Sequence, residues 1–281
     1  MKIANLTTAA FLLSATMALA LPQFSAQPAA QGKPAQNVAA SAQATKSPQA
    51  KTQAEYDFYK AAAALTDPAK LEAEATEFAQ KFPASELRSI LFQQAMGLYQ
   101  QSNDSSKALD MARTVLKYDP GNAVALLTAS QILAERTHES DLDHDDRLAE
   151  ASADARSALQ NTAGIAPPTN LTPEQFAAAL AELRGTAHEV LATVAFKKQD
   201  YFTAIKEFNL AIAEEEEHTD AVVWLRLSVA HDKNGDYNSA EGAAQKAIAA
   251  SQAGSQVRQL AEQEKSRLEK LSPQAAKPAG K

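Results

Sequence analysis

The stretch Ala221–Ala247, AVVWLRLSVAHDKNGDYNSAEGAAQKA, has the pattern of two short helices joined by a tight turn. Bulky side chains recur at helical spacing from Trp224, and the turn falls at Gly235-Asp236. A second set of positions at helical spacing follows the turn and is filled by alanine, at Ala240, Ala244 and Ala247. Because small residues let two helix axes approach closely, the stretch predicts an antiparallel helix pair.

The same pattern occurs earlier in the chain. Asp200, Ala204 and Ala211 precede Asp236, Ala240 and Ala247 by 36 residues each, which fixes the register of the last two pairs. Residues 89–122 repeat the pattern once more and close on Pro120. We therefore interpret the chain as an array of helix pairs.

Trp224, Leu227, the turn at Gly235 and the alanines after it resemble the tetratricopeptide repeat (TPR), whose pattern is W-x2-L-G-x2-Y, a turn, A-x3-F and a closing proline. The resemblance extends over about residues 53–271. It implies an all-α fold, a right-handed superhelix (α-solenoid) of stacked antiparallel helix pairs, and a scaffold that binds other proteins.

The boundaries of the pairs follow from caps, prolines and alanine spacing. Asp67-Pro68 starts one helix, and Thr172-Pro173 starts another that runs either unbroken to Lys198 or as two helices joined near Gly185. The predicted pairs are 53–83, 89–122, 123–163 with an insertion at 136–148, 172–216 and 221–250, followed by a capping helix at 255–271.

Both ends of the chain differ in composition from the array. Residues 1–20 predict a cleaved secretory signal, with Lys2 before the apolar run 9–21 and cleavage after Ala20; an uncleaved anchor is the alternative. Residues 21–52 and 272–281 are rich in Ala, Gln and Pro and predict disordered segments. We expect the protein in the periplasm or secreted.

The array itself is acidic. Six of the 27 basic residues lie in 1–52 and 272–281, which contain no acid, so residues 53–271 carry a formal charge of −13. Such a body repels phosphate backbones, which argues against nucleic acid as a ligand and favours a polypeptide partner. Alternatively, the charge only keeps an alanine-rich array soluble.

Catalytic motifs are missing from the sequence. It contains no H-E-x-x-H, G-x-S-x-G, P-loop or G-x-G-x-x-G pattern and no cysteine, so we predict neither an enzyme nor a cofactor, nor a small-molecule substrate. His188 and His231 stand where the repeat keeps Trp and Tyr, and we expect both to be packing residues.

The insertion RTHESDLDHDDRL is rich in acids. Its weak candidates for metal ligands are His138, Asp141, Asp143 and Asp145. A calcium loop would need glycine where Asp146 stands and glutamate where Ser152 stands, so we expect a solvated acidic loop and no metal. The alternative function is a cation-binding protein, or an accessory to an envelope enzyme, that acts through His138–Asp146.

The resemblance implies that a peptide binds along the first helix of each pair. Leu127, Phe196 and Leu225 would then be exposed apolar residues of this groove. Where some family members capture chaperone C-termini with Lys and Asn, this chain has Gln93, Gly97 and Val124, so that partner class is not expected. Self-association is a further possibility. The implied groove residues are Gln93, Gln100, Gln101, Leu127, Gln131, Glu189, Thr193, Phe196, Lys197, Leu225, Val229, Asp232 and Lys233.

Overall fold

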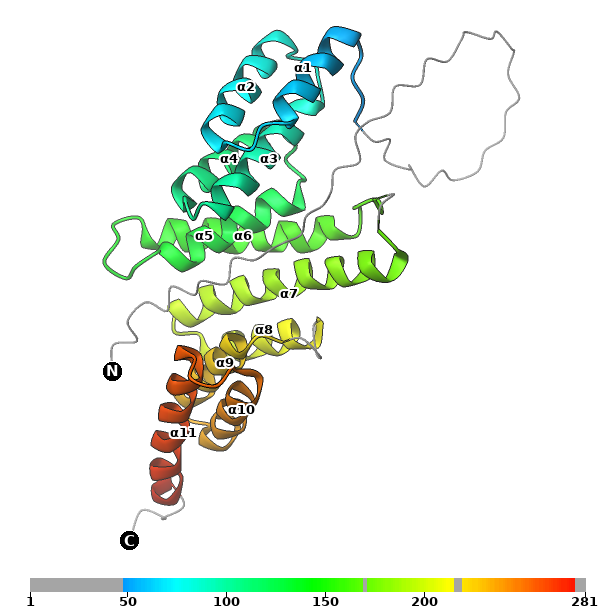
Figure 1. The fold of residues 1–281 in the computed structure, drawn as a ribbon. Helices are drawn as coiled ribbons and strands as arrows, with labels where there is room; N and C mark the ends of the chain where they lie inside the picture. Colours follow the sequence, from blue (N-terminus) through cyan, green and yellow to red (C-terminus); the bar gives the residue numbers. More distant parts are fainter. Residues whose placement is uncertain (1–47, 169–170, 215–218, 276–281) are drawn as a thin grey trace, which may run out of the picture. The chain divides into compact units, whose positions relative to one another are not determined.

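The computed structural model describes residues 48–168, 171–214 and 219–275, and these residues form helices without any strand (Figure 1). The predicted signal, most of the segment 21–52 and residues 276–281 lie outside the described residues. The helices are α1 Gln53–Ala63, α2 Pro68–Lys81, α3 Leu87–Gln101, α4 Ser105–Tyr118, α5 Ala123–Arg136, α6 His144–Thr162, α7 Pro173–Lys197, α8 Tyr201–Glu214, α9 Ala221–Lys233, α10 Tyr237–Ala250 and α11 Gln256–Ala275.

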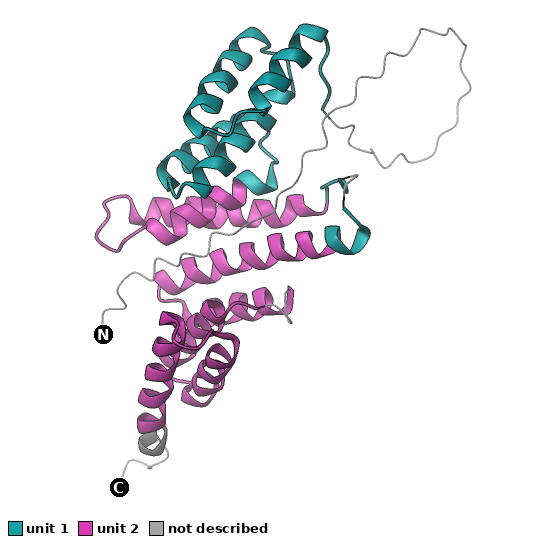
Figure 2. Cartoon of the chain, in the orientation of Figure 1, with its two compact units in different colours: residues 1–125, 164–176 teal, residues 126–163, 177–281 magenta. Residues whose placement is uncertain are grey.

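The helices belong to two compact units (Figure 2). Unit 1 contains α1 to α4, together with 123–125 and 164–176, and unit 2 contains 126–163 and 177–281. In unit 1, α1 packs on α2 and α3, and in unit 2, α9 packs on α10 and α11. The all-α, TPR-like arrangement of helix pairs is therefore confirmed.

In three of the helix pairs, the two helices are joined by the same type of turn. The middle residue of each turn has a left-handed backbone, with φ 59° at Asn103, 61° at Gln199 and 81° at Gly235. The aspartate that follows it donates its N–H to a carbonyl five residues back and caps the next helix, with its Oδ1 accepting a backbone N–H at 3.1 Å. These Asp residues are Asp104, Asp200 and Asp236. The shared hydrogen bonds make the second helix of each pair fold back on the first.

Of these three residues, Gln199 is the least favourable for a left-handed backbone, because at positive φ its Cβ atom lies too close to the following carbonyl oxygen. Gln199→Gly should raise the free energy of unfolding by about 1 kcal/mol, since glycine adopts the left-handed region without that cost. Thermal melting monitored by circular dichroism measures the change. The reverse substitution, Gly235→Gln, is the matched control and should destabilise; equal melting points for all three proteins would contradict the shared turn geometry.

The core of unit 1 lies between α2, α3 and α4. On α2, Leu71, Ala75 and Phe78 are fully buried. At the rim, the hydroxyl of Tyr99 on α3 donates to Glu72 on α2 at 2.5 Å, and Lys107 on α4 donates to the same carboxylate. Burial and this hydrogen bond raise the pKa of Tyr99 to about 12. One polar cluster thus ties three helices together.

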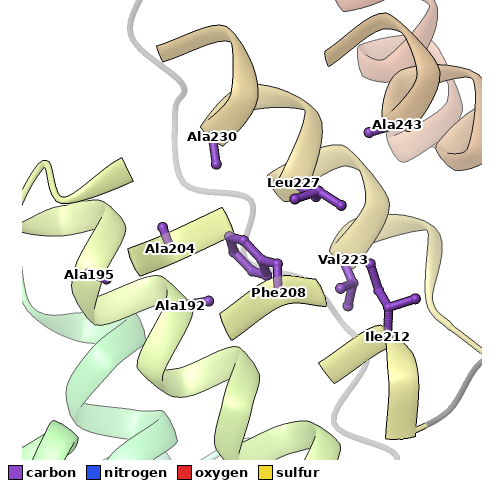
Figure 3. Close-up of a cluster of buried hydrophobic side chains, with 9 residues drawn as sticks. All are labelled: Ala192, Ala195, Ala204, Phe208, Ile212, Val223, Leu227, Ala230 and Ala243. Carbon is purple, nitrogen blue, oxygen red and sulfur yellow. The ribbon is translucent and has the colours of Figure 1, made fainter. Parts of the chain in front are cut away.

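Unit 2 has an alanine-rich core, drawn in Figure 3. Phe208 of α8 is buried among small side chains of α7 and α9, and Trp224 packs against the edge of the cluster. Ser228, also fully buried, donates its hydroxyl to the carbonyl of Ala240 at 2.7 Å. The buried residues of this cluster are Ala192, Ala195, Ala204, Phe208, Ile212, Val223, Leu227, Ala230 and Ala243.

Three predicted helix boundaries need comment, because the structure either differs from the prediction or decides between two predicted alternatives. α7 is a single helix through Gly185, because one glycine costs only about 1 kcal/mol and the helix buries most residues between Leu183 and Ala195. α11 continues to Ala275, so the disordered tail predicted at 272–281 is wrong for 272–275.

The third boundary concerns the insertion predicted at 136–148. Helices reach into it from both sides, and only residues 137–143 are not helical. Asp145 and Asp146 lie in the first turn of α6, where negative charge stabilises the exposed N–H groups. Among the described residues, none of the helices combines the length and the hydropathy of a membrane span.

Candidate polypeptide-binding site

One face of α3 keeps the properties expected of a binding surface. We call Ile90, Gln93, Gly97, Gln100 and Gln101 the α3 strip; their spacing places them on one side of the helix. All are half-buried except Gln101, which is exposed. The Oε1 atom of Gln93 accepts a hydrogen bond from the Asn122 side chain at 3.0 Å, which fixes this amide. The strip carries no formal charge.

Gly97 lies at the centre of the α3 strip and faces open space. A Cβ atom built at this position would meet no atom within 4 Å. Its helical backbone needs no glycine, because only Gly235 and Gly254 have positive φ among the described glycines. The bare backbone between two amide-bearing turns therefore leaves room for something outside the chain.

Lys197, by contrast, is used inside the protein. Its Nζ donates to the carbonyl oxygens of Ala134, Glu135 and Thr137 at the carboxyl end of α5, the last two at 3.2 and 2.8 Å. All three ammonium protons have acceptors, and the positive charge faces the negative end of a helix. Burial lowers the pKa of Lys197, and nearby Glu135 partly offsets this. Lys197 therefore caps the carboxyl end of α5 and is not available to a partner.

The last predicted groove segment, on α9, is covered by α11. Leu225 is 7% exposed and packs with Ala247 and Ala261, while Val229 packs against the same cluster. Asp232 Oδ2 lies 2.6 Å from Arg267 Nη2, and Arg267 also binds Glu264 at 2.8 Å. These two carboxylates raise the pKa of Arg267. The face of α9 that was predicted to bind a partner instead holds the last helix.

The expectation that three apolar residues are exposed in the groove is therefore wrong. Leu127 is 2% exposed and Leu225 is 7% exposed. Phe196 is half-buried, packs against the core cluster of unit 2 and meets the Tyr201 ring edge-on at 5.4 Å. The physical reason is that the clusters of unit 2 are rich in alanine, so the few large side chains, Phe196 and Leu225 among them, fill the space between the helices. On α5, every residue from Ala125 to Ser130 is buried.

The other predicted groove residues of unit 2 are at least partly accessible to solvent. Gln131, Glu189 and Thr193 are half-buried, and Lys233 is exposed at the end of α9. They stand on three different helices, α5, α7 and α9. Their part in binding stays a prediction.

The acidic insertion does not gather its candidate ligands. Asp141 Oδ2 accepts the backbone N–H of His138 at 2.8 Å and lies 3.9 Å from Arg147. Asp143 also faces Arg147, at 4.0 Å, and Asp145 contacts His144. Within the described ranges, no three His, Asp or Glu side chains converge as metal ligands do. The residues instead brace a turn.

Two histidines contact acidic residues inside unit 2. His188 Nδ1 lies 2.7 Å from Glu207 Oε2, which joins α7 to α8. His231 Nδ1 is buried without a hydrogen bond, with Asp236 Oδ2 3.5 Å away. Both side chains are largely enclosed by α7 to α10, as a packing role requires.

His231 makes the stability of unit 2 depend on pH. Burial lowers the pKa of His231 below its ordinary value of 6.5, against the weaker pull of Asp236. The unfolded chain therefore binds this proton more readily, so the free energy of unfolding should fall as the pH drops below 6.5. His231→Tyr should flatten this dependence in urea unfolding measured from pH 7 to pH 5. Parallel curves for variant and wild type would contradict the assignment.

The comparisons with known proteins concern the fold. No family model matches the sequence, and no curated protein matches it. Among solved structures, the chain is similar to a thermophilic TPR protein of Thermus thermophilus, at 14% identity over 75% of this chain and 98% of that one, with a TM-score of 0.45. It is also similar to an assembly chaperone of RpL4 (11% identity, 79% and 99% coverage, TM-score 0.41) and to a tetratricopeptide repeat protein of Parabacteroides merdae (14%, 81% and 95%, 0.37).

Proposed function

We propose that this chain is a noncatalytic scaffold of the cell envelope that binds an extended polypeptide segment on the α3 strip. The observation that carries the proposal is Gly97, a glycine in a helix interior with open space in front of it. Such a glycine costs about 0.5–1 kcal/mol relative to alanine. No neighbour in the described structure requires it, and a ligand that approaches the backbone here would account for its presence.

The neighbours of Gly97 suggest what kind of ligand fits. Gln93, Gln100 and Gln101 carry amides, each with donors and an acceptor, and no charge. These groups match the N–H and C=O groups of an extended main chain, and a strip without charge has no means to select an ionised terminus. Ile90 adds one apolar contact. The ligand class is therefore a polypeptide recognised mainly through its backbone.

A glycine alone does not define such a site. Gly242 on α10 also faces open space, but it is exposed and lies beside Glu241 and Gln245 on a charged surface. It provides the matched control. Because both glycines are helical and unobstructed, leucine at either position should raise stability by about 0.5–1 kcal/mol, so a loss of binding cannot be ascribed to unfolding.

The test compares proteins retained from an envelope extract and identified by mass spectrometry. Wild type and Gly242→Leu should retain the same set, and Gly97→Leu should lose it. A further variant lacking residues 138–143 should behave as wild type. If Gly97→Leu binds normally and the loop deletion does not, the function lies in the insertion, and a cation-binding or enzyme-accessory role replaces the scaffold.

The placement in the envelope rests on the leader sequence. An apolar run at 9–21 after Lys2, ending in small residues, is typical of an exported protein. We expect the mature protein to begin at Leu21, as N-terminal sequencing of the protein from fractionated cells would show. An intact Met1 in the cytoplasmic fraction would contradict export, and an intact Met1 in the membrane fraction would indicate an anchor.

A further inference from the structure

The outer face of α8 is an apolar and positively charged ridge. Phe202, Lys206 and Leu210 follow at spacings of four residues, so they lie in one row, which we call the α8 ridge. Phe202 is 73% exposed and Leu210 is 39% exposed. The two acids of α8 point elsewhere: Glu207 binds His188 and Glu214 binds Arg184, each at 2.7 Å. On an acidic chain, the ridge therefore presents a cation between two apolar side chains.

A second exposed apolar site, at Leu142, has negatively charged residues near it in the sequence. Leu142, in the loop 137–143, is 108% exposed, the highest value among the large apolar residues that the structure describes. Asp141 and Arg147 brace the turn beneath it. Glu139, Asp143 and Asp146 are exposed beside it. The loop thus exposes one apolar side chain in a segment that is rich in carboxylates.

Other exposed apolar groups do not share this property. Tyr118 is 39% exposed, but the Arg88 guanidinium lies 4.4 Å from its ring centre and Phe92 stacks on its ring at 5.8 Å. Tyr118 therefore already has partners within unit 1. The remaining large exposed apolar residues of the described chain are Leu142 and the two on the α8 ridge.

We propose that the Leu142 loop of one copy docks on the α8 ridge of a second copy. Leu142 packs against the apolar side chains of the α8 ridge, and the acids around it meet Lys206. The two surfaces differ, so the contact is heterologous and joins copies head to tail. A symmetric contact of α8 with α8 would instead place Lys206 against Lys206, where like charges repel. Charge thus favours the loop as the occupant.

The size and charge of the surfaces also define the strength of this association. Residues 53–271 carry a formal charge of −13, so two copies repel at long range. Against this repulsion stands one apolar anchor with a few charge contacts, far fewer than a permanent interface has. Association should therefore appear as the protein is concentrated, and not in dilute solution.

Complementation between variants tests the proposal. By sedimentation velocity of the full chain, the average mass of wild type should rise from micromolar to millimolar concentration. Leu142→Ser and Phe202→Ser should each lose this rise, because each lacks one half of the contact. Their mixture should form a one-to-one dimer, since the second variant keeps the loop and the first keeps the ridge. No larger species should form.

Charge reversal provides the second readout. Lys206→Glu should abolish the concentration-dependent rise, whereas Lys70→Glu, at an exposed position in the first turn of α2, should not. Circular dichroism should show unchanged melting for these surface variants. The proposal is overturned if wild type stays monomeric at every concentration, if either serine variant associates as wild type does, or if the mixture gives no dimer.

Discussion

Phe208→Ala should lower the free energy of unfolding of unit 2 by about 3–5 kcal/mol. Phe208 is 1% exposed and is the largest side chain in a cluster that otherwise consists of alanine, valine, leucine and isoleucine (Figure 3). The alanines around it cannot extend into the space that the ring leaves, so a cavity should remain. Urea unfolding can be followed through the fluorescence of Trp224, the only tryptophan, which packs against this cluster.

Phe202 on the same helix is the matched control. Its ring is 73% exposed, so Phe202→Ala should change stability by no more than about 0.5 kcal/mol. The two substitutions remove the same atoms from one helix and differ only in which side of it they face. Similar losses for both would mean that the face of α8 that packs on α7 and α9 has been misidentified.

Leu225→Ala should cost about 2–5 kcal/mol, although a groove position would predict almost no loss. Leu225 packs with Ala247 of α10 and Ala261 of α11, so its removal loosens three helices at once. Leu210→Ala removes the same side chain from an exposed position and should leave stability nearly unchanged. Chemical unfolding of the two variants measures the contrast. A small loss at Leu225 would return this residue to the list of binding candidates.

The sequence predicts the helix pairs well because their determinants are local. Asp104, Asp200 and Asp236 cap helices through backbone N–H groups only a few residues away, and alanines such as Ala204 and Ala240 mark the contacts by their size. The position of the turns follows from the same residues. Local signals of this kind are readable from a single sequence.

The binding face is predicted less well, because its state depends on residues distant in sequence. Lys197 closes α5 through carbonyl groups about sixty residues earlier, and Asp232 is bound by Arg267 of the last helix. A rule that assigns inner-face positions within one pair cannot include such partners. The α8 ridge could have been found: Phe202 and Leu210 fall on the side opposite Ala204 and Phe208 in the helical pattern.

Ion pairs across the array restrict how it can change length. In repeat arrays each unit contacts only its neighbours, so whole helix pairs can be duplicated or lost. Here Glu135 on α5 accepts from Arg226 on α9 at 2.8 Å, across 91 residues, and Lys197 on α7 holds the end of α5. A helix pair inserted between them would separate these groups by a helix diameter, about 10 Å. The part of unit 2 from α5 to α9 is therefore of fixed size, and duplication of a helix pair would have to occur outside it.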